Sequence, residues 1–284
     1  MSELQIRRMT LPELQEMAVA WAAAEGWNPG LHDAPGFYAA DPEGFLGGWL
    51  NGEPVACISA VRYRPDFGFI GFYIVRPDYR GKGYGLEIWK AAMQHLEGRN
   101  IGLDGVVAQQ ENYKRSGFQF AYNNIRYEGM NTPEFIPQTS ASLVSCHQLS
   151  FDELMAYDRR YFPADRPEFL TAWLRQPEAV ALAVVTENQI QGYGMIRPCR
   201  QGYKIGPLFA ETLDVAEHLL NALGQQIPPQ APYYLDVPAV NPDAVALAER
   251  HGMQPVFETA RMYTGPIPEI DINGVFGVTT FELG

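Results

Sequence analysis

The chain has 284 residues, a length that favours two domains. Its composition, with 46% hydrophobic and 19% charged residues, is that of an ordinary globular protein, and no apolar run is long enough to span a membrane. The formal net charge is −12, so the surface repels nucleic acid and anionic membranes and attracts cations. We therefore expect neither nucleic acid nor membrane as a partner.

The cysteines are few and scattered. Cys57, Cys146 and Cys199 are odd in number and far apart, which is untypical of a disulfide framework or a zinc site. The polar N-terminal residues have no apolar signal core. A reducing cytoplasm fits this pattern best, and we expect no metal.

The pattern of apolar residues and turn residues predicts strands and helices in mixed order. In the first half we expect these elements: a helix over 11–24, strands over 45–50, 55–62 and 67–75, a helix over 85–96, a strand over 105–107, a helix over 109–115 and a closing strand over 118–128. This order indicates an α/β (or α+β) layer fold.

Two segments of the first half recur in the second. Thr10 with Glu13, and Ser150 with Glu153, both have the spacing of a capping box at a helix start. Residues 113–118 likewise correspond to residues 248–253, where a helix ends at a glycine and an apolar residue follows. The chain therefore reads as two related domains, residues 1–130 and 143–284, with a polar, proline-containing linker at 131–142.

A glycine-rich basic turn is the sharpest motif. The apolar strand up to Val75 is followed by Arg80-Gly-Lys-Gly-Tyr-Gly85 and then by an amphipathic helix. Glycines let the backbone approach an anion closely, and the unsatisfied N–H groups and the dipole of a helix start attract negative charge. With Arg80 and Lys82, the turn predicts a pyrophosphate cradle, although it lacks the spacing of a P-loop.

The turn matches the R/Q-x-x-G-x-G/A motif of the GNAT N-acetyltransferase superfamily. A Tyr four residues before a Gly-Phe pair, here Tyr113 and Gly117-Phe118, is the second hallmark. The chain resembles the bacterial double-domain proteins of this superfamily. The resemblance implies two tandem GNAT folds, each a mixed, mostly antiparallel sheet flanked by helices, with a catalytic domain at 1–130 and a degenerate GNAT-like domain at 143–284.

The resemblance also implies roles for single residues. Acetyl-CoA would be the cosubstrate, and Tyr113 would be the general acid that protonates the departing thiolate. Ile74, Val75 and Arg76 would bind the pantetheine arm and the acetyl carbonyl through their backbone. The complete set of implied cofactor-binding residues is Ile74, Val75, Arg76, Arg80, Gly81, Lys82, Gly83, Tyr84, Gly85 and Asn112.

The sequence does not identify the base that deprotonates the amine. Many family members carry a Glu on the strand that corresponds to 67–75, and this strand has no acid. Asp104, Asp33, Glu111 or an ordered water are the alternatives.

The second half departs from the family pattern in its cofactor loop. It keeps Asn241, at a position where many members have Asn, but Ala248 replaces the tyrosine, and Glu211 stands where phosphates would bind. A carboxylate there repels an anion, so we expect that this half has lost the cofactor and braces the first domain or walls the substrate site.

The resemblance leaves several functions open. Acetyl transfer to a small-molecule amine is the leading hypothesis, with a pocket expected between the two domains. The alternatives are N-acetylation of a protein or peptide, a non-catalytic acyl-CoA sensor or scaffold, and transfer of a longer acyl group. The bulky Phe69, Phe72 and Tyr73 favour a small acyl group over a long one. The oligomeric state is not predicted.

Overall fold

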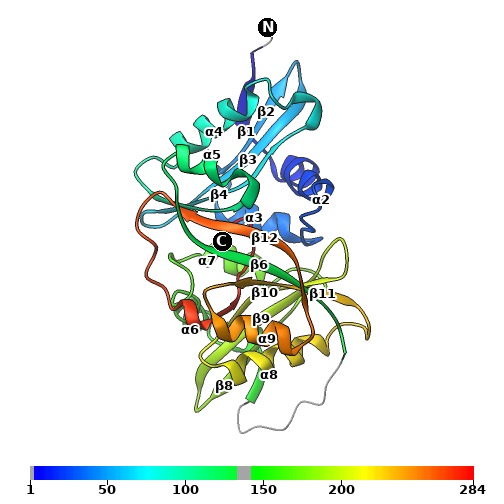
Figure 1. Ribbon diagram of the computed structural model, residues 1–284. Coiled ribbons are helices and arrows are strands. Elements are labelled where there is room, and N and C mark those ends of the chain that lie inside the picture. Colours follow the sequence, from blue (N-terminus) through cyan, green and yellow to red (C-terminus); the bar gives the residue numbers. More distant parts are fainter. Residues whose placement is uncertain (1–2, 133–141) are drawn as a thin grey trace.

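Residues 3–132 and 142–284 are described in a computed structural model of the chain (Figure 1). The elements of the first half are β1 (Gln5–Arg8), α1 (Leu11–Glu13), η1 (Leu14–Val19), α2 (Ala20–Ala24), α3 (Asp33–Ala40), β2 (Phe45–Leu50), β3 (Glu53–Tyr63), β4 (Phe67–Val75), η2 (Pro77–Tyr79), α4 (Tyr84–His95), β5 (Asn100–Val106), η3 (Val107–Gln109), α5 (Gln110–Arg115) and β6 (Gln119–Met130). The predicted strands and helices of this half are present, with ends shifted by a few residues.

The second half repeats the pattern of strands and helices. Its elements are β7 (Ser142–Ser145), η4 (Cys146–Gln148), α6 (Phe151–Asp158), α7 (Pro167–Trp173), β8 (Val180–Thr186), β9 (Gln189–Pro198), β10 (Tyr203–Ala210), α8 (Leu213–Gly224), β11 (Pro232–Pro238), α9 (Pro242–Arg250), β12 (Gln254–Tyr263), η5 (Ile272–Gly274) and β13 (Val275–Gly277). Most of the predicted linker, residues 133–141, lies outside the described residues.

The helix starts bear out one of the two predicted capping boxes. Thr10 accepts a hydrogen bond from the N–H of Glu13, and the Glu13 carboxylate accepts one from the N–H of Thr10. The segment that follows, η1, is a π-helix, so the predicted helix over 11–24 is not a uniform α-helix. The box predicted at Ser150 is wrong, because the Ser150 side chain makes no cap hydrogen bond, although α6 still begins at the next residue.

The described strands form one mixed, mostly antiparallel sheet of 13 strands. Their order is β1-β2-β3-β4-β5-β12-β6-β11-β10-β9-β8-β7, and β13 pairs with β10. Helices α4 and α5 lie beside the strands of the first half, and α8 and α9 lie beside those of the second (Figure 1). The mixed sheet flanked by helices agrees with the predicted fold class, but the halves share it.

The halves exchange their last strands. The sequence predicts that residues 118–128 close the sheet of the first half, and this prediction is wrong. Strand β6 instead pairs with β11 and β12, and β12 lies between β5 and β6 (Figure 1). The register of the exchanged strands places opposite charges on facing residues, which stabilises this pairing. Arg126 faces Asp236, and Arg261 faces Asp104. We keep residues 1–130 and 143–284 as a proposal for the duplicated units.

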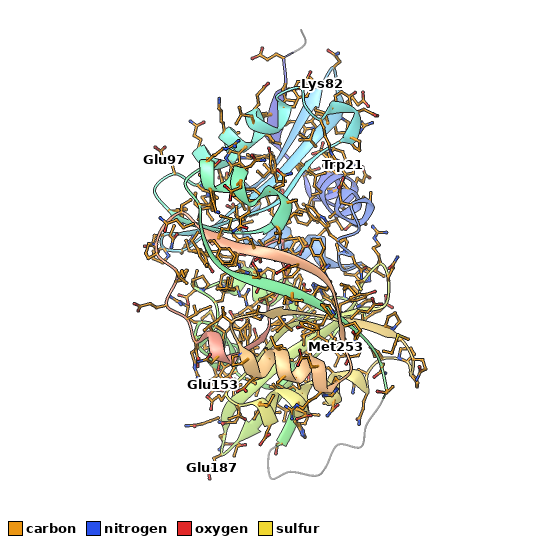
Figure 2. The ribbon with its side chains drawn as sticks, in the orientation of Figure 1. Trp21, Lys82, Glu97, Glu153, Glu187 and Met253 are labelled. Carbon is orange, nitrogen blue, oxygen red and sulfur yellow. The ribbon has the colours of Figure 1, made fainter. Side chains whose placement is uncertain are left out.

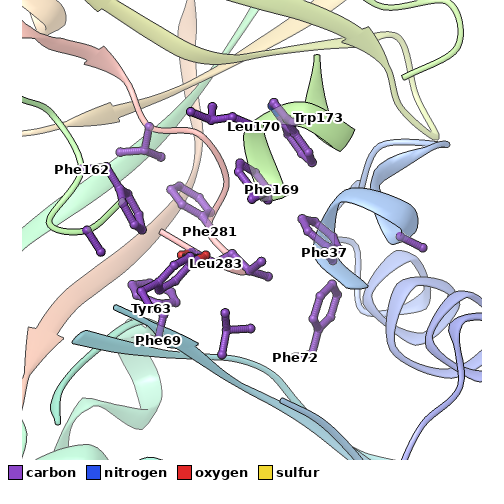
Figure 3. Packing of buried hydrophobic residues seen from close by; sticks show 14 of the residues in the cluster. Phe37, Tyr63, Phe69, Phe72, Phe162, Phe169, Leu170, Trp173, Phe281 and Leu283 are labelled. Carbon is purple, nitrogen blue, oxygen red and sulfur yellow. Dashed lines mark hydrogen bonds between the residues drawn. The ribbon is translucent and has the colours of Figure 1, made fainter. Parts of the chain in front are cut away.

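Three hydrophobic clusters hold the layers together. One lies between α4 and the sheet of the first half, and a second lies between α8, α9 and the sheet of the second half. The third joins the halves. Phe37 of the first half stacks on the buried ring of Trp173, and Phe72 contacts Phe37. Phe281 and Leu283 pack nearby (Figure 3). The shared core and the exchanged strands fix how the two halves sit. None of the helices in the described part of the chain has the length and apolar character that a membrane crossing needs.

Candidate active site

Strands β4 and β5 part in the middle of the first half. They pair in parallel from Phe67 with Asn100 to Ile70 with Leu103, and no pairing continues beyond. The backbone of β4 bends here, since Phe72 has a left-handed φ of 48° and the register with β3 shifts. The polar backbone groups of the last β4 residues therefore face a gap instead of a neighbouring strand, as the resemblance implies for Ile74 and Val75.

The glycine-rich turn leads into α4 as expected. Gly81 and Gly83 have left-handed φ angles of 75° and 92°, and Gly83 caps the helix without a side-chain hydrogen bond. An added Cβ at either glycine would meet no atom within 4 Å, so the space in front of the helix start is open. The first N–H groups of α4 are thus available for an anion.

Arg80 is held at the edge of this space. Its Nε donates a hydrogen bond to the backbone oxygen of Val75 at 2.8 Å, and its Nη2 pairs closely with the Glu25 carboxylate. Glu25 therefore neutralises part of the positive charge beside the helix start. Both side chains are partly exposed, so their mutual attraction is screened by water.

Four of the predicted cofactor residues do not line the gap. The Arg76 side chain donates to Glu53 at 2.6 Å, and Lys82 donates to the backbone oxygen of Asp78 at 2.7 Å. Lys82 is exposed at the end of the molecule near β3 (Figure 2). The remaining two, Tyr84 and Asn112, also lie outside the cavity described below, and the Asn112 amide donates to Gln109.

Tyr113 lies at the open end of β5, on the short helix α5. Its ring packs against the indole of Trp89, with the ring centroids 5.7 Å apart. The ring also lies against β5, because a Cβ added at Gly105 would be 2.3 Å from Tyr113 Cε2. Burial, with a smaller contribution from Tyr73, raises the pKa of Tyr113 to about 12. Tyr113 thus remains a protonated hydroxyl at neutral pH, as a general acid must.

One cavity of about 590 Å³ joins these features. Seven of the predicted residues line it: Ile74, Val75, Arg80, Gly81, Gly83, Gly85 and Tyr113. The second half contributes four more, namely Phe257, Thr259, Phe281 and Glu282. The cavity is therefore lined by both halves, and the exchanged strand β12 forms part of its wall.

The acids considered from the sequence are each paired with a cation. Asp104 lines the cavity, but it forms a two-pronged ion pair with Arg261, at 2.8 and 2.6 Å. Although burial opposes the charged form of Arg261, the Asp104 carboxylate holds the pKa of Arg261 well above its ordinary value. Asp33 pairs with Arg197 at 2.8 Å, and the exposed Glu111 pairs with Lys114 on the surface.

A fourth acid, Glu282, was not considered from the sequence. It lines the cavity and is only 4% exposed, although it is 178 residues from Asp104 in the chain (282 − 104). No motif or spacing points to it, because the chain end reaches the cavity only in the folded protein.

The corresponding gap in the second half is filled by the chain itself. Strand β10 pairs in parallel with β11 only from Tyr203 to Ile205, and β13 pairs with β10 beyond that point. The Asn241 side chain donates to the backbone oxygens of Asn273 and Val275, at 2.9 and 3.0 Å. Glu211, at the start of α8, is paired with Arg160. Nothing like the open gap of the first half is present there.

Comparisons with known proteins agree with this geometry. A model of the acetyltransferase (GNAT) family matches residues 8–118, and a model of an acetyltransferase (GNAT) domain matches residues 154–277. The holothin acyltransferase of Pseudoalteromonas sp. strain SANK 73390 is 31% identical over 264 residues, covering 93% of this chain and 89% of the relative. The chain belongs to the GNAT acetyltransferase family. It is a tandem member and an acyl- or acetyltransferase.

Solved structures support the tandem arrangement of this GNAT protein. A Pyrococcus horikoshii protein named as a candidate acetyltransferase superposes with a TM-score of 0.84 at 25% identity, covering 99% of this chain and 96% of the other. A tandem GNAT protein from the clavulanic acid biosynthesis pathway has a TM-score of 0.65 at 12% identity, covering 93% and 100%. GNAT enzymes generally use acetyl-CoA as cosubstrate, and the described residues contain no group of side chains suited to hold a metal ion.

Proposed function

We propose that this GNAT enzyme transfers an acetyl group from acetyl-CoA to the amine of a small molecule. The observation that carries the proposal is the parting of β4 and β5 beside Tyr113, with the open start of α4 at the other side of the same cavity. The backbone of β4, the start of α4 and the Tyr113 hydroxyl surround a single space, and this arrangement supports the proposal. A CoA thioester has matching parts: an amide-containing arm, a pyrophosphate and a departing sulfur.

Each part of acetyl-CoA has a proposed partner. The backbone of Ile74 and Val75 binds the pantetheine arm and the acetyl carbonyl, and the turn from Arg80 to Gly85 binds the pyrophosphate. Of the family-implied residues, Arg76, Lys82, Tyr84 and Asn112 contribute only from outside the cavity, through backbone groups or long-range charge. No metal takes part.

The reaction proceeds by direct attack. The amine nitrogen attacks the thioester carbon, the new C–N bond forms, the C–S bond breaks, and Tyr113 gives its proton to the departing thiolate. No covalent enzyme intermediate is needed. Part of the cavity would hold the arm of acetyl-CoA. The part that remains has aromatic residues of both halves in its wall, and this favours a compact acceptor over a protein or peptide chain.

The deciding experiment measures release of the CoA thiol from acetyl-CoA across a panel of amines, amino acids and peptides. We expect turnover with small amines and a loss of about 10²-fold or more in kcat for Tyr113→Phe, with acetyl-CoA binding unchanged. Tight binding of acetyl-CoA without turnover, equal in both proteins, would instead support the acyl-CoA sensor. A higher rate with long-chain acyl-CoA than with acetyl-CoA would overturn the small acyl group.

A further inference from the structure

The C-terminal segment runs from the second half into the cavity of the first. After β13, the N–H of Val278 donates to the backbone oxygen of Asp236 at 2.8 Å, and the Tyr63 hydroxyl donates to the backbone oxygen of Leu283 at 3.2 Å. Phe281 and Leu283 pack among the rings between the halves (Figure 3). The backbone of this segment passes so close to β4 that a Cβ added at Gly71 would be 2.1 Å from the backbone oxygen of Glu282. Glu282 is thereby fixed in the cavity wall.

Glu282 is a buried carboxylate with no cation paired to it. The Thr280 hydroxyl donates a close hydrogen bond to it, and within the described ranges no Lys, Arg or His forms an ion pair with it. Arg126 interacts with it from a distance but is held by Asp236, at 2.6 and 2.7 Å. Isolated buried charge is costly, so such a group normally meets a cation or a hydrogen-bond donor.

Lys204 is the remaining cation near Glu282. The residue is 3% exposed, and its buried amino group makes no hydrogen bond to the described residues. Burial, followed by the charge of Arg126, lowers the pKa of Lys204, while Glu282 and Asp236 oppose the shift. Lys204 is on β10 and does not line the cavity, so it does not occupy the space in front of Glu282.

The cavity wall that includes Glu282 also holds aromatic rings and a buried threonine. Trp27, Phe257 and Phe281 line the same cavity, and the rings of Phe257 and Phe281 lie 6.4 Å apart. Thr259, only 2% exposed, also lines it, and its Oγ1 has no hydrogen-bond partner among the described residues. A buried hydroxyl without a protein partner is completed by a water or a ligand atom. The Arg126 guanidinium lies over the Phe281 and Phe257 rings, 4.8 and 5.8 Å from their centroids. A carboxylate pairs with an ammonium group, and ring surface packs against a flat apolar body.

We propose that Glu282 binds the ammonium group of the acceptor and takes its proton, and that the acceptor is a primary amine carried by a compact aromatic group. This inference rests on the proposed function. The cationic amine gives one proton to the Glu282 carboxylate, its lone pair attacks the thioester carbon, and the proton given up by Tyr113 goes to the CoA thiolate. The second proton of the nitrogen restores the Tyr113 hydroxyl, and Glu282 releases its proton to solvent, so the products are the amide, CoA and one proton.

A binding experiment tests the site without turnover. The probes are benzylamine, which is cationic at pH 7, and the neutral benzyl alcohol, titrated by ligand-observed NMR against the full chain with and without CoA. We expect benzylamine to bind at least about tenfold more weakly to Glu282→Gln than to wild type, and benzyl alcohol to bind both alike. Glu258→Gln is the matched control, because Glu258 is the exposed neighbour of Thr259 on β12. Equal benzylamine binding to wild type and Glu282→Gln, or no binding to wild type, would overturn the proposal.

A kinetic experiment separates the base from a structural role. Glu282→Gln should lower kcat/KM for benzylamine by about 10²-fold, but much less for O-benzylhydroxylamine, whose amino group is neutral at pH 7. Equal losses for both acceptors would contradict a proton-accepting role. If acetyl-CoA binds neither wild type nor Glu282→Gln, the proposed function fails. The benzylamine titration still decides in that case whether Glu282 recognises a cation.

Discussion

The Asn241 side chain donates a hydrogen bond to the backbone oxygen of Val275 at 3.0 Å, and this bond ties α9 to the strand that fills the gap of the second half. The same side chain accepts hydrogen bonds from the N–H groups of Asp243 and Ala244 and so caps α9. Asn241 therefore serves the chain's own backbone.

Substitution of Asn241 separates its two roles. Asn241→Ala removes the cap and the bonds to β13, and we expect it to lower the free energy of unfolding by about 2–4 kcal/mol. Asn241→Asp keeps the cap acceptor but directs a carboxylate at backbone oxygens, so it should also destabilise the protein. Urea denaturation measures both, and wild-type stability in Asn241→Asp would show that only the cap matters.

The buried ion pair between Arg126 and Asp236 holds the exchanged strand β6 against β11. Arg126→Met leaves the Asp236 charge buried without its partner, and we expect a loss of about 3–5 kcal/mol in the free energy of unfolding. Replacing both residues, with Met and Leu, should recover much of that loss. The surface pair of Arg250 with Glu217 is the control, since Arg250→Met should cost about 1 kcal/mol or less. Equal effects of the two arginine substitutions would contradict this account.

Gly105 leaves room for the ring of Tyr113. A methyl group there overlaps Tyr113 Cε2, so Gly105→Ala should displace the ring and lower kcat by about tenfold or more, with little change in acetyl-CoA affinity. Gly102→Ala, also on β5, would contact Phe69 and Tyr263 instead and controls for general damage to the strand. An unchanged kcat in Gly105→Ala would argue that the position of Tyr113 does not matter for the chemistry.

Glu25 pairs with Arg80, which we propose as a ligand of the acetyl-CoA pyrophosphate. Glu25→Gln frees the guanidinium and removes a negative charge beside the start of α4, so we expect acetyl-CoA to bind more tightly, by about fivefold at most, because the pair is partly exposed. The gain should shrink at high salt. Glu97→Gln makes the same change of net charge beyond the far end of α4 and should leave the acetyl-CoA Kd unchanged (Figure 2). Weaker binding in Glu25→Gln would show that Glu25 positions Arg80 for the cofactor.

With Tyr113 as the proposed general acid, we expect its raised pKa to extend the reaction to higher pH. An ordinary tyrosine loses its proton near pH about 10, whereas burial raises the pKa of Tyr113 to about 12. The acid form therefore persists at higher pH, and kcat should not fall through loss of the Tyr113 proton until the pH approaches 12. A pH profile of kcat for wild type and Tyr113→Phe checks this. A decline centred below about pH 10 in wild type, absent from Tyr113→Phe, would contradict the assignment.

The sequence by itself determined those parts of the fold and site that depend on local chemistry. Gly81 and Gly83 adopt left-handed angles that glycine tolerates best, and the Thr10 box caps its helix through residues three apart. Tyr113 and the glycine that ends its helix were likewise recognisable from short spacing. Seven of the residues predicted for cofactor binding and catalysis line the cavity for the same reason, since one strand, one turn and one short helix carry them.

Features that join residues far apart in the chain became visible only in the folded protein. The pairing of β6 with β11 sets Arg126 opposite Asp236, and no periodicity within β6 reveals this partner. Likewise, β13 fills the gap of the second half by pairing with β10. Glu282 reaches the cavity of the first half because Phe281 and Leu283, on either side of it, pack into the core between the halves. Buried charges and core contacts depend on three-dimensional proximity, and a linear pattern does not encode which distant partner completes them.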